Sequence, residues 1–182
     1  MVDTQLTQYF VAASLDGFIA AEGDDLSWLE LEGIGEADQA NPYEEFIADV
    51  GALAMGATTY EWVQRHLDGW LYEQRPTWVF THHELTPIDG AVLRFTADDV
   101  ATVHARMLAE AVGKNLWVVG GGDLAGQFMD AGLLDELWLS IAPVTLGRGA
   151  PLLPRHRTTP MTLLSVTPAS NDTYVHLRYR LH

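Results

Sequence analysis

Runs of apolar, β-branched and aromatic residues recur along the chain, and their length and composition predict eight β-strands. The predicted strands are Leu6–Ala13, Ala52–Met55, Thr77–Thr81, Val92–Phe95, Leu116–Val119, Glu136–Ala142, Met161–Thr167 and Thr173–Arg180. A helical repeat separates several of these strands. It is clearest over Ala97–Val112, where a mostly apolar stripe recurs at the spacing of one helix face.

Three further helices are predicted between the strands. Pro42 precedes Tyr43–Ile47, and a proline followed by acidic residues favours the start of a helix. Thr58 or Thr59 is expected to cap a second helix. The last helix is expected at about Asp123–Ala131, directly before a glycine that would end it.

Strands and helices alternate to about residue 134, and the last two predicted strands, which look antiparallel, finish the chain without a helix between them. This order predicts an α/β fold with a mixed, mostly parallel sheet and antiparallel C-terminal strands. The sequence shows no internal repeat, low-complexity tract or long linker. We therefore expect residues 1–182 to form a single domain.

Composition narrows the classes of function. Of the 182 residues, 48% are hydrophobic and 19% are charged, which provides enough apolar surface for a buried core. The formal net charge of −15 argues against nucleic acid or an anionic membrane as a partner. The absence of cysteine excludes disulfides, thiolate metal sites and cysteine nucleophiles. Because the sequence has neither a membrane-spanning apolar run nor a signal-peptide pattern, a cytoplasmic location is expected.

The charges are unevenly distributed along the chain. Residues 1–64 contain 13 acidic residues and neither lysine nor arginine, so that an anionic ligand there would be held by backbone N–H groups. Residues 140–182 contain five arginines and one acidic residue, Asp172. This basic segment is either a solvated edge or a surface for an anionic ligand or for the acidic part of a partner subunit.

Two strand ends lead through glycine directly into a predicted helix. Gly120, Gly121 and Gly122 follow one strand, and Gly56 follows another. Glycine lets a ligand approach the backbone closely, and the N–H groups at a helix start favour phosphate. A tight turn explains the glycine triplet equally well, because the sequence matches neither the dinucleotide fingerprint nor the P-loop. Two such seats at strand ends would suit a diphosphate or a dinucleotide.

These segments, taken in order, resemble the dihydrofolate reductase fold family, and especially its branch similar to the C-terminal reductase domain of the riboflavin-biosynthesis deaminase–reductase. The resemblance extends over nearly the whole chain, and five stretches carry it: Val11–Ala20, Met55–Glu61, Gly120–Gly122, Gly132–Leu137 and Ala142–Gly149. The resemblance implies a dihydrofolate reductase-like three-layer sandwich. It also implies a cis peptide in the glycine pair and a reductase that uses NADPH, with NADH also possible.

The resemblance places three groups of residues at the cofactor. They are Ala12, Ile19 and Ala20 at the nicotinamide; Gly56, Ala57, Thr58 and Thr59 at one phosphate, with Gly120, Gly121, Gly122, Asp123 and Leu124 at the other; and Thr81 and His82 near the adenosine ribose. It also places Trp28 over the substrate, although this residue could instead be a core aromatic. The arginine that the family places between Gly56 and Thr58 is Ala57 here, and Thr81-His82 replaces a Ser-Arg or Thr-Arg pair. Preference for NADPH over NADH is therefore open.

The proton donor is assigned less directly. The resemblance places an acid near the start of the helix after Pro42, where Glu44 and Asp38 are the candidates, and a solvated first-turn acid is the alternative for both. Asp16 is expected to build a turn or to contact the polar edge of a substrate. His104 and His176 have no metal-ligand spacing around them, so no metal site is expected.

Three functions remain open from the sequence. The first is reduction of 5-amino-6-(5-phosphoribosylamino)uracil or a related small heterocycle, in which Arg148 or Arg155 would have to contact the phosphate. The second is dihydrofolate reductase-like activity on a pteridine, and the third is a non-catalytic nucleotide-binding or dimerisation module. Members of the branch are commonly homodimers, and Leu134–Ile141 is either a central strand or an edge that a second subunit covers.

Overall fold

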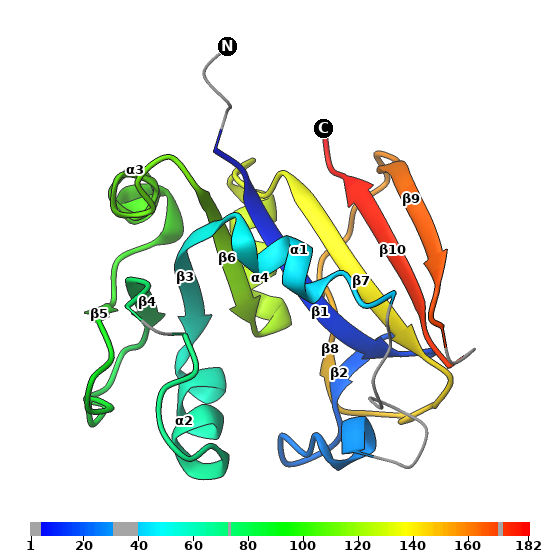
Figure 1. The fold of residues 1–182 in the computed structure, drawn as a ribbon, viewed down its shortest axis with the longest axis horizontal. Coiled ribbons are helices and arrows are strands. Elements are labelled where there is room, and N and C mark those ends of the chain that lie inside the picture. The colour runs from blue at the N-terminus through cyan, green and yellow to red at the C-terminus, as the bar shows by residue number, and fades with distance from the viewer. Residues whose placement is uncertain (1–4, 31–39, 73, 171–172) are drawn as a thin grey trace.

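An eight-stranded sheet forms the centre of the molecule. We describe it from a computed structural model, which covers residues 5–30, 40–72, 74–170 and 173–182. The strands of this sheet are β1 (Thr7–Ser14), β3 (Val50–Gly56), β4 (Thr77–Phe80), β5 (Leu93–Thr96), β6 (Asn115–Gly120), β7 (Glu136–Ala142), β9 (Thr162–Pro168) and β10 (Val175–Arg180). Their order across the sheet is β5-β4-β3-β6-β1-β7-β10-β9 (Figure 1). Neighbours from β5 to β7 are parallel, whereas β10 is antiparallel to both β7 and β9.

The eight predicted strands all occur within the described residues, and β7 has the predicted bounds. Two short strands were not predicted: β2 (Phe18–Ala20) and β8 (Ala150–Pro151), which pair with each other in a separate sheet. Strands of three and two residues are too short to show an alternating pattern. Their pairing depends instead on a contact between segments far apart in the sequence.

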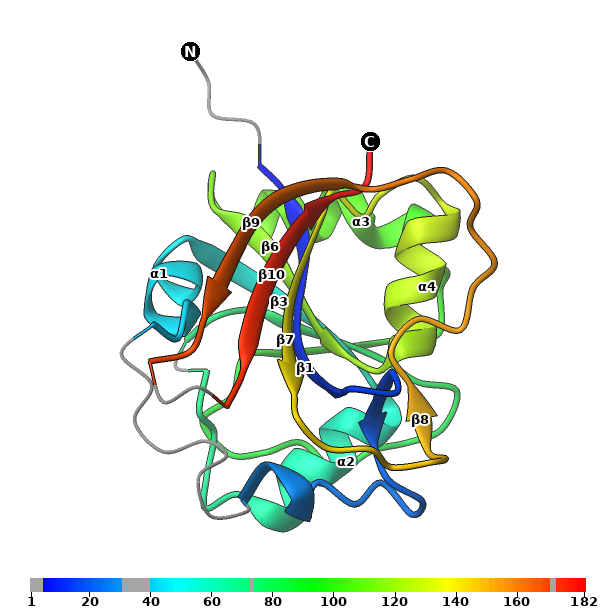
Figure 2. The ribbon, with the colours of Figure 1, turned by 90° about the vertical axis from the view of Figure 1, so that its right-hand side faces the viewer.

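Helices cover both faces of the sheet and give the expected three layers. The helices are α1 (Tyr43–Ala48), α2 (Ala57–His66), α3 (Val100–Glu110) and α4 (Gly122–Asp130), with one turn of 3-10 helix, η1 (Ser27–Glu30). Figure 2 shows α1 on one face of the sheet and α3 and α4 on the other. Helix α2 lies at the edge where β3 ends (Figure 1).

The prediction that Thr58 or Thr59 caps α2 is wrong. The helix begins at Ala57, and Gly56, two positions before Thr58, occupies the N-cap position without a side-chain hydrogen bond. In α3, by contrast, the Asp99 side chain caps the helix and accepts a hydrogen bond from the backbone N–H of Thr102. The first N–H groups of α2 therefore lack a side-chain cap, and both threonines lie in the first helical turn.

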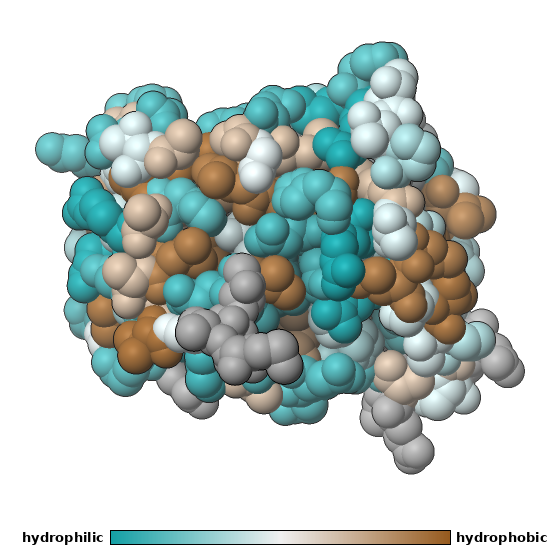
Figure 3. Space-filling model, turned by 90° about the horizontal axis from the view of Figure 1, so that it is seen from above, coloured by the Kyte–Doolittle hydropathy of each residue, from teal (hydrophilic) through white to brown (hydrophobic). Residues whose placement is uncertain are grey.

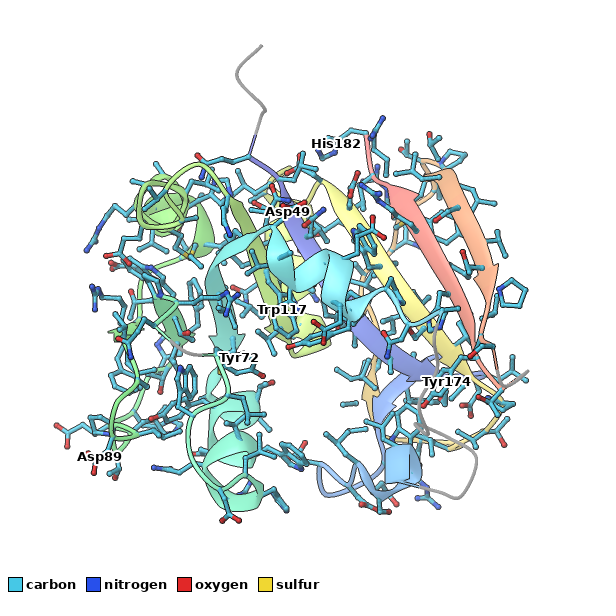
Figure 4. The ribbon with its side chains drawn as sticks, viewed as in Figure 1. Asp49, Tyr72, Asp89, Trp117, Tyr174 and His182 are labelled. Carbon is cyan, nitrogen blue, oxygen red and sulfur yellow. The ribbon has the colours of Figure 1, made fainter. Side chains whose placement is uncertain are left out.

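Each face of the sheet has its own apolar core. Val103 and Met107 of α3 and Phe128 of α4 are fully buried on one face. The α1 face is built from aromatic rings, among them Phe46 and Trp117, whose centroids lie 5.5 Å apart in an edge-to-face contact. In Figure 4, Trp117 lies in front of the sheet with Tyr72 close to it. Burial of each such side chain contributes about 1.5–3 kcal/mol to folding.

Strand β7 lies inside the sheet, between β1 and β10. The interpretation of Leu134–Ile141 as an edge for a second subunit is therefore wrong, and the alternative of a central strand is confirmed. The two edges of the sheet are β5 and β9. The homodimer itself stays a prediction.

The surface view in Figure 3 shows the molecule from above, with hydrophilic and hydrophobic residues interspersed over this end. The C-terminus lies on this side, opposite the edge where α2 is found (Figure 1). Within the described parts of the chain, the helices are too short or too polar to cross a membrane.

Candidate active site

The carboxyl ends of the parallel strands meet at the lower edge of the sheet in Figure 1. At this edge β3 leads directly into α2, and β6 leads through Gly121 into α4. In open α/β sheets, ligands bind outside the carboxyl ends of the strands, close to the helices that follow them. A ligand-binding site is therefore expected at this edge.

The first cavity at this edge has a volume of about 450 Å³ and mostly apolar walls. Its lining residues come from α2 and from the segment that contains β2 and η1, among others. Its lining residues are Phe10, Val11, Ala12, Ile19, Ala20, Asp24, Leu26, Leu29, Thr58, Thr59, Trp62, Val119, Gly120, Gly121, Gly122, Asp123, Ala150, Pro151 and Pro154. An apolar cavity of this size is typical of sites for small organic ligands.

A second cavity, of about 430 Å³, continues from the first. The two share Thr58, Thr59, Gly121 and Asp123 as lining residues, and we refer to both together as the cleft. The remaining residues that line the second cavity are Gly56, Ala57, Phe80, Thr81, His82, Thr96, Ala97, Asp98, Asp99, Leu124 and Gln127. The cleft thus runs past the starts of both α2 and α4.

Both helix starts are suited to a phosphate group. Their N-cap residues, Gly56 and Gly121, make no side-chain cap, so that the first N–H groups of α2 and α4 are available to a ligand. A Cβ atom built on Gly121 would have no heavy atom within 4 Å, which shows open space beside the backbone. The peptide between Gly120 and Gly121 is cis, as the resemblance implies.

Gly122 has the opposite surroundings. A Cβ atom on this residue would overlap the carbonyl oxygens of Pro151 and Leu152, so only glycine allows α4 to approach β8 so closely. Because Pro151 also lines the first cavity, this contact fixes α4 against one wall of the cleft.

The β2–β8 wall of the cleft is held by Asp16. Its carboxylate accepts hydrogen bonds from the Ser14 hydroxyl at 2.6 Å and from the backbone N–H groups of Leu146 and Gly147 at 3.0 and 2.7 Å. These contacts join the turn before β2 to the loop before β8. The prediction that Asp16 builds a turn is confirmed.

The hydrogen bond from Ser14, followed by those from the two backbone N–H groups, holds the pKa of Asp16 below its usual range. Because folding lowers this pKa, the hydrogen bonds to the Asp16 carboxylate stabilise the folded state above about pH 4. This stabilisation is lost as the pH falls through the lowered pKa.

We expect Asp16→Asn to lower the midpoint of thermal unfolding slightly at neutral pH, since the side chain is exposed to solvent. The difference from the wild type should shrink as the pH falls below about 4. Asp89→Asn is the control, because Asp89 is an exposed aspartate on the far side of the molecule (Figure 4). A difference that persists unchanged into strong acid would contradict the role assigned to the carboxylate.

The structure brings all of the predicted cofactor residues together. Each of them lines at least one of the two cavities. Ala12, Ile19, Ala20, Gly120 and Gly122 line the first; Gly56, Ala57, Thr81, His82 and Leu124 line the second; and Thr58, Thr59, Gly121 and Asp123 line both. Segments that are far apart in the sequence thus form one continuous surface.

The predicted catalytic residues are placed less consistently. Glu44 is an exposed residue of α1 and does not line the cleft as the described residues define it. Asp38 lies outside the described residues. Trp28 is 5% exposed, so its side chain is part of the protein interior, whereas its neighbours Leu26 and Leu29 line the first cavity. The catalytic roles of all three residues stay predictions.

Sequence analysis missed several lining residues, of which Trp62 is the largest. It follows Thr58 by four positions in α2, so the helical repeat could have placed the two side chains on one face. Phe10 precedes Ala12 by two positions in β1 and could have been found in the same way. Leu26 and Leu29 have no local signal, because they belong to an irregular segment.

Arg148 and Arg155, the two arginines considered for a substrate phosphate, are both paired within the chain. Arg155 contacts Asp123 at 2.9 Å and Asp130 at 2.6 Å, and Arg148 lies 3.4 Å from Glu22. A hydrogen bond from Gln127, followed by the contact with Arg155, lowers the pKa of Asp123. Either arginine would therefore have to give up an acidic partner to contact a substrate phosphate.

His104 and His176, which have no metal-ligand spacing around them in the sequence, each lie within hydrogen-bonding distance of a hydroxyl group. His104 Nε2 lies 2.8 Å from the Thr7 Oγ1 atom, and partial burial lowers the pKa of this imidazole. His176 Nδ1 lies 2.8 Å from Ser140 Oγ, on the α1 face of the sheet.

Known proteins resemble this chain in sequence and in structure. The family model described as RibD C-terminal domain matches residues 6–175. The Bacillus subtilis (strain 168) protein named "Uncharacterized protein YwjB" is 35% identical over 147 residues, which are 80% of this chain and 81% of that protein. A protein from Shewanella sp. PV-4, provisionally assigned to riboflavin biosynthesis, has a TM-score of 0.76 at 23% identity, with 98% of this chain and 100% of that one covered.

A dihydrofolate reductase from Enterococcus faecalis, solved with NADP(H), has a TM-score of 0.63 at 15% identity and covers 97% of each chain. This likeness shows that the fold is dihydrofolate reductase-like. The sequence matches and the glycine-lined cleft lead to one conclusion: the chain belongs to the RibD C-terminal domain family.

Proposed function

We propose that the chain is an NADPH-dependent reductase of a small heterocyclic or ribosylamine substrate. The observation that carries this proposal is the continuous cleft, which joins two uncapped helix starts to an apolar cavity. The helix starts suit the diphosphate of a dinucleotide, and the apolar cavity suits a nicotinamide beside a second ring. Membership of the RibD C-terminal domain family supports a reductase.

The residues present fit this cofactor. The open space at Gly121 would accommodate one phosphate against the start of α4, and the N–H groups after Gly56 would bind a second. Ala12, Ile19 and Ala20 would contact the nicotinamide in the first cavity. The bound cofactor supplies the hydride. These residues would orient the nicotinamide and keep water away from it.

The second cavity suggests little selectivity between NADPH and NADH. Its described lining residues include no lysine or arginine, whereas Asp98 and Asp99 line it together with Thr81 and His82. A 2′-phosphate would therefore gain no strong cationic partner there. We expect the two reduced cofactors to bind with affinities within about tenfold of each other.

Cofactor titration tests both statements. NADPH and NADH are each titrated against the protein with tryptophan fluorescence as the readout, and oxidation is then followed with the uracil ribosylamine phosphate and with dihydrofolate. Binding of both cofactors in the micromolar range supports the proposal. Absence of binding by either cofactor would contradict it and would leave the non-catalytic module. A preference for NADPH of a hundredfold or more would contradict the statement on selectivity alone.

A further inference from the structure

We propose that the first cavity binds a planar heteroaromatic ring that carries no phosphate or carboxylate group, with the indole of Trp62 as its stacking surface. This inference rests on the proposed function, because the ring would lie beside the nicotinamide. It goes further by naming the chemical class of the substrate and a residue that selects it.

Contacts with a neighbouring side chain restrict the orientation of the Trp62 indole. Trp62 lies one helical turn after Thr58, and both side chains line the first cavity. One turn further along α2, the imidazole of His66 stacks on the indole with ring centroids 4.6 Å apart and planes within 15° of parallel. His66 Nδ1 also lies 2.9 Å from the backbone oxygen of Trp62. The indole is therefore held in one orientation while its side chain remains partly exposed.

Most of the other residues that line the first cavity are apolar. Ile19, Leu26 and Leu29 line it from the segment between β1 and α1, on the side away from α2 (Figure 1). Phe10 lines it from the sheet, and its ring packs on Phe46 at a centroid distance of 4.6 Å, which limits its movement. An aromatic ring between such walls gains stacking and burial energy without a specific hydrogen bond.

The charges around the first cavity select against anions. Asp24 and Asp123 are its charged lining residues among those described. Of the neighbouring arginines, Arg155 is bonded to Asp123 and Arg148 pairs with Glu22. A phosphate or carboxylate on the substrate would therefore meet two acidic side chains, and either arginine would have to give up an acidic partner to contact it. The helix starts, which lie where the two cavities meet, would already be occupied by the phosphates of a bound cofactor.

The test compares two ligands that differ only in one phosphate: 5-amino-6-(ribosylamino)uracil and its 5′-phosphate. Isothermal titration calorimetry measures the affinity of each ligand for the full chain, with and without saturating NADP⁺. The variants are Trp62→Leu, which keeps an apolar side chain, and Trp62→Phe, which keeps an aromatic ring. Trp70→Phe is the matched control, because the Trp70 indole nitrogen is buried without a hydrogen-bond partner, so phenylalanine loses no such bond.

We expect the ligand without phosphate to bind at least about tenfold more tightly than its phosphate. Trp62→Leu should weaken its binding about tenfold, Trp62→Phe by no more than about threefold, and Trp70→Phe should leave it unchanged. Tighter binding of the phosphate, equal affinity of the wild type and Trp62→Leu, or failure of both ligands to bind would each overturn this inference. Failure of NADP⁺ and NADPH to bind would instead overturn the proposed function, and the titrations without cofactor would still decide this one.

Discussion

Valine in place of Gly121 is expected to lower the affinity for NADPH at least about a hundredfold while the domain remains folded. Gly121 has φ −78° and ψ −177°, a conformation that residues with side chains adopt readily. A Cβ atom there would meet no heavy atom within 4 Å. The Cβ atom of an added side chain therefore fits here, and the rest of the side chain would project into the part of the cleft where the proposed cofactor phosphate would meet α4.

The measurement is a fluorescence titration with NADPH, accompanied by thermal unfolding of each variant. Ala105→Val is the control, since it adds the same β-branched side chain at an exposed position of α3. The control should bind NADPH like the wild type. If Gly121→Val also bound NADPH with unchanged affinity, the cofactor would not lie along the start of α4. A large loss of thermal stability in Gly121→Val would show instead that the space is not open.

The prediction for Gly121 could be made from the sequence because its signal is local. A buried strand followed by glycines and a helix occupies only about ten consecutive residues, and the strand patterns around it were equally clear. The same holds for Gly56 and the threonines after it. Fourteen candidate residues from separate segments line one cleft because parallel strands bring their carboxyl ends to the same edge.

Features that depend on contacts between distant segments could not be predicted. Strands β2 and β8 form only because Phe18 and Ala20 pair with Pro151 and Ala150, which come much later in the sequence. The stacking of Trp62 on His66 is local, but whether that helix face looks into a cavity depends on the segment opposite. The cap of α2 was assigned to a threonine because its hydroxyl is a common cap, whereas the helix begins directly after Gly56.

The basic C-terminal segment shows the same limit. Its five arginines suggested a solvated edge or a surface for an anionic ligand or partner subunit. The structure shows that all five interact within the chain. Arg148 pairs with Glu22, Arg155 with Asp123 and Asp130, Arg157 donates to the Leu181 carbonyl, and Arg178 and Arg180 lie against Glu136. The net charge of the segment did not reveal these pairs, because the acids involved lie mostly in earlier parts of the sequence.

Glu136 is the most deeply buried acid in these pairs, with 1% of its side chain exposed. Its carboxylate accepts hydrogen bonds from Gln8 Nε2 at 2.9 Å and from the Trp138 indole N–H at 3.2 Å. The Arg178 guanidinium donates to both of its oxygens and also lies over the Trp138 ring, 4.3 Å from the centroid. The network joins β1, β7 and β10, and so ties the antiparallel part of the sheet to the strands that carry the cleft.

Glu136→Gln is expected to destabilise the protein by about 3 kcal/mol, which is a large part of the 5–15 kcal/mol typical of a folded domain. The amide keeps the shape of the side chain but cannot neutralise Arg178, and its NH₂ group would face other donors. The figure is at the lower end for a buried pair because the Arg178 side chain is 31% exposed. Urea unfolding gives the free energy directly.

Two further variants test whether the loss of stability comes from the burial of the Glu136–Arg178 ion pair. Glu22→Gln removes the partner of Arg148 in a pair whose side chains are 68% and 77% exposed, and should cost less than about 1 kcal/mol. Glu136→Leu combined with Arg178→Met removes both buried charges, and should cost less than the sum of the two single changes, because neither charge is then left without its partner. A loss for Glu136→Gln as small as that for Glu22→Gln would show that solvent, rather than Glu136, stabilises the charge of Arg178.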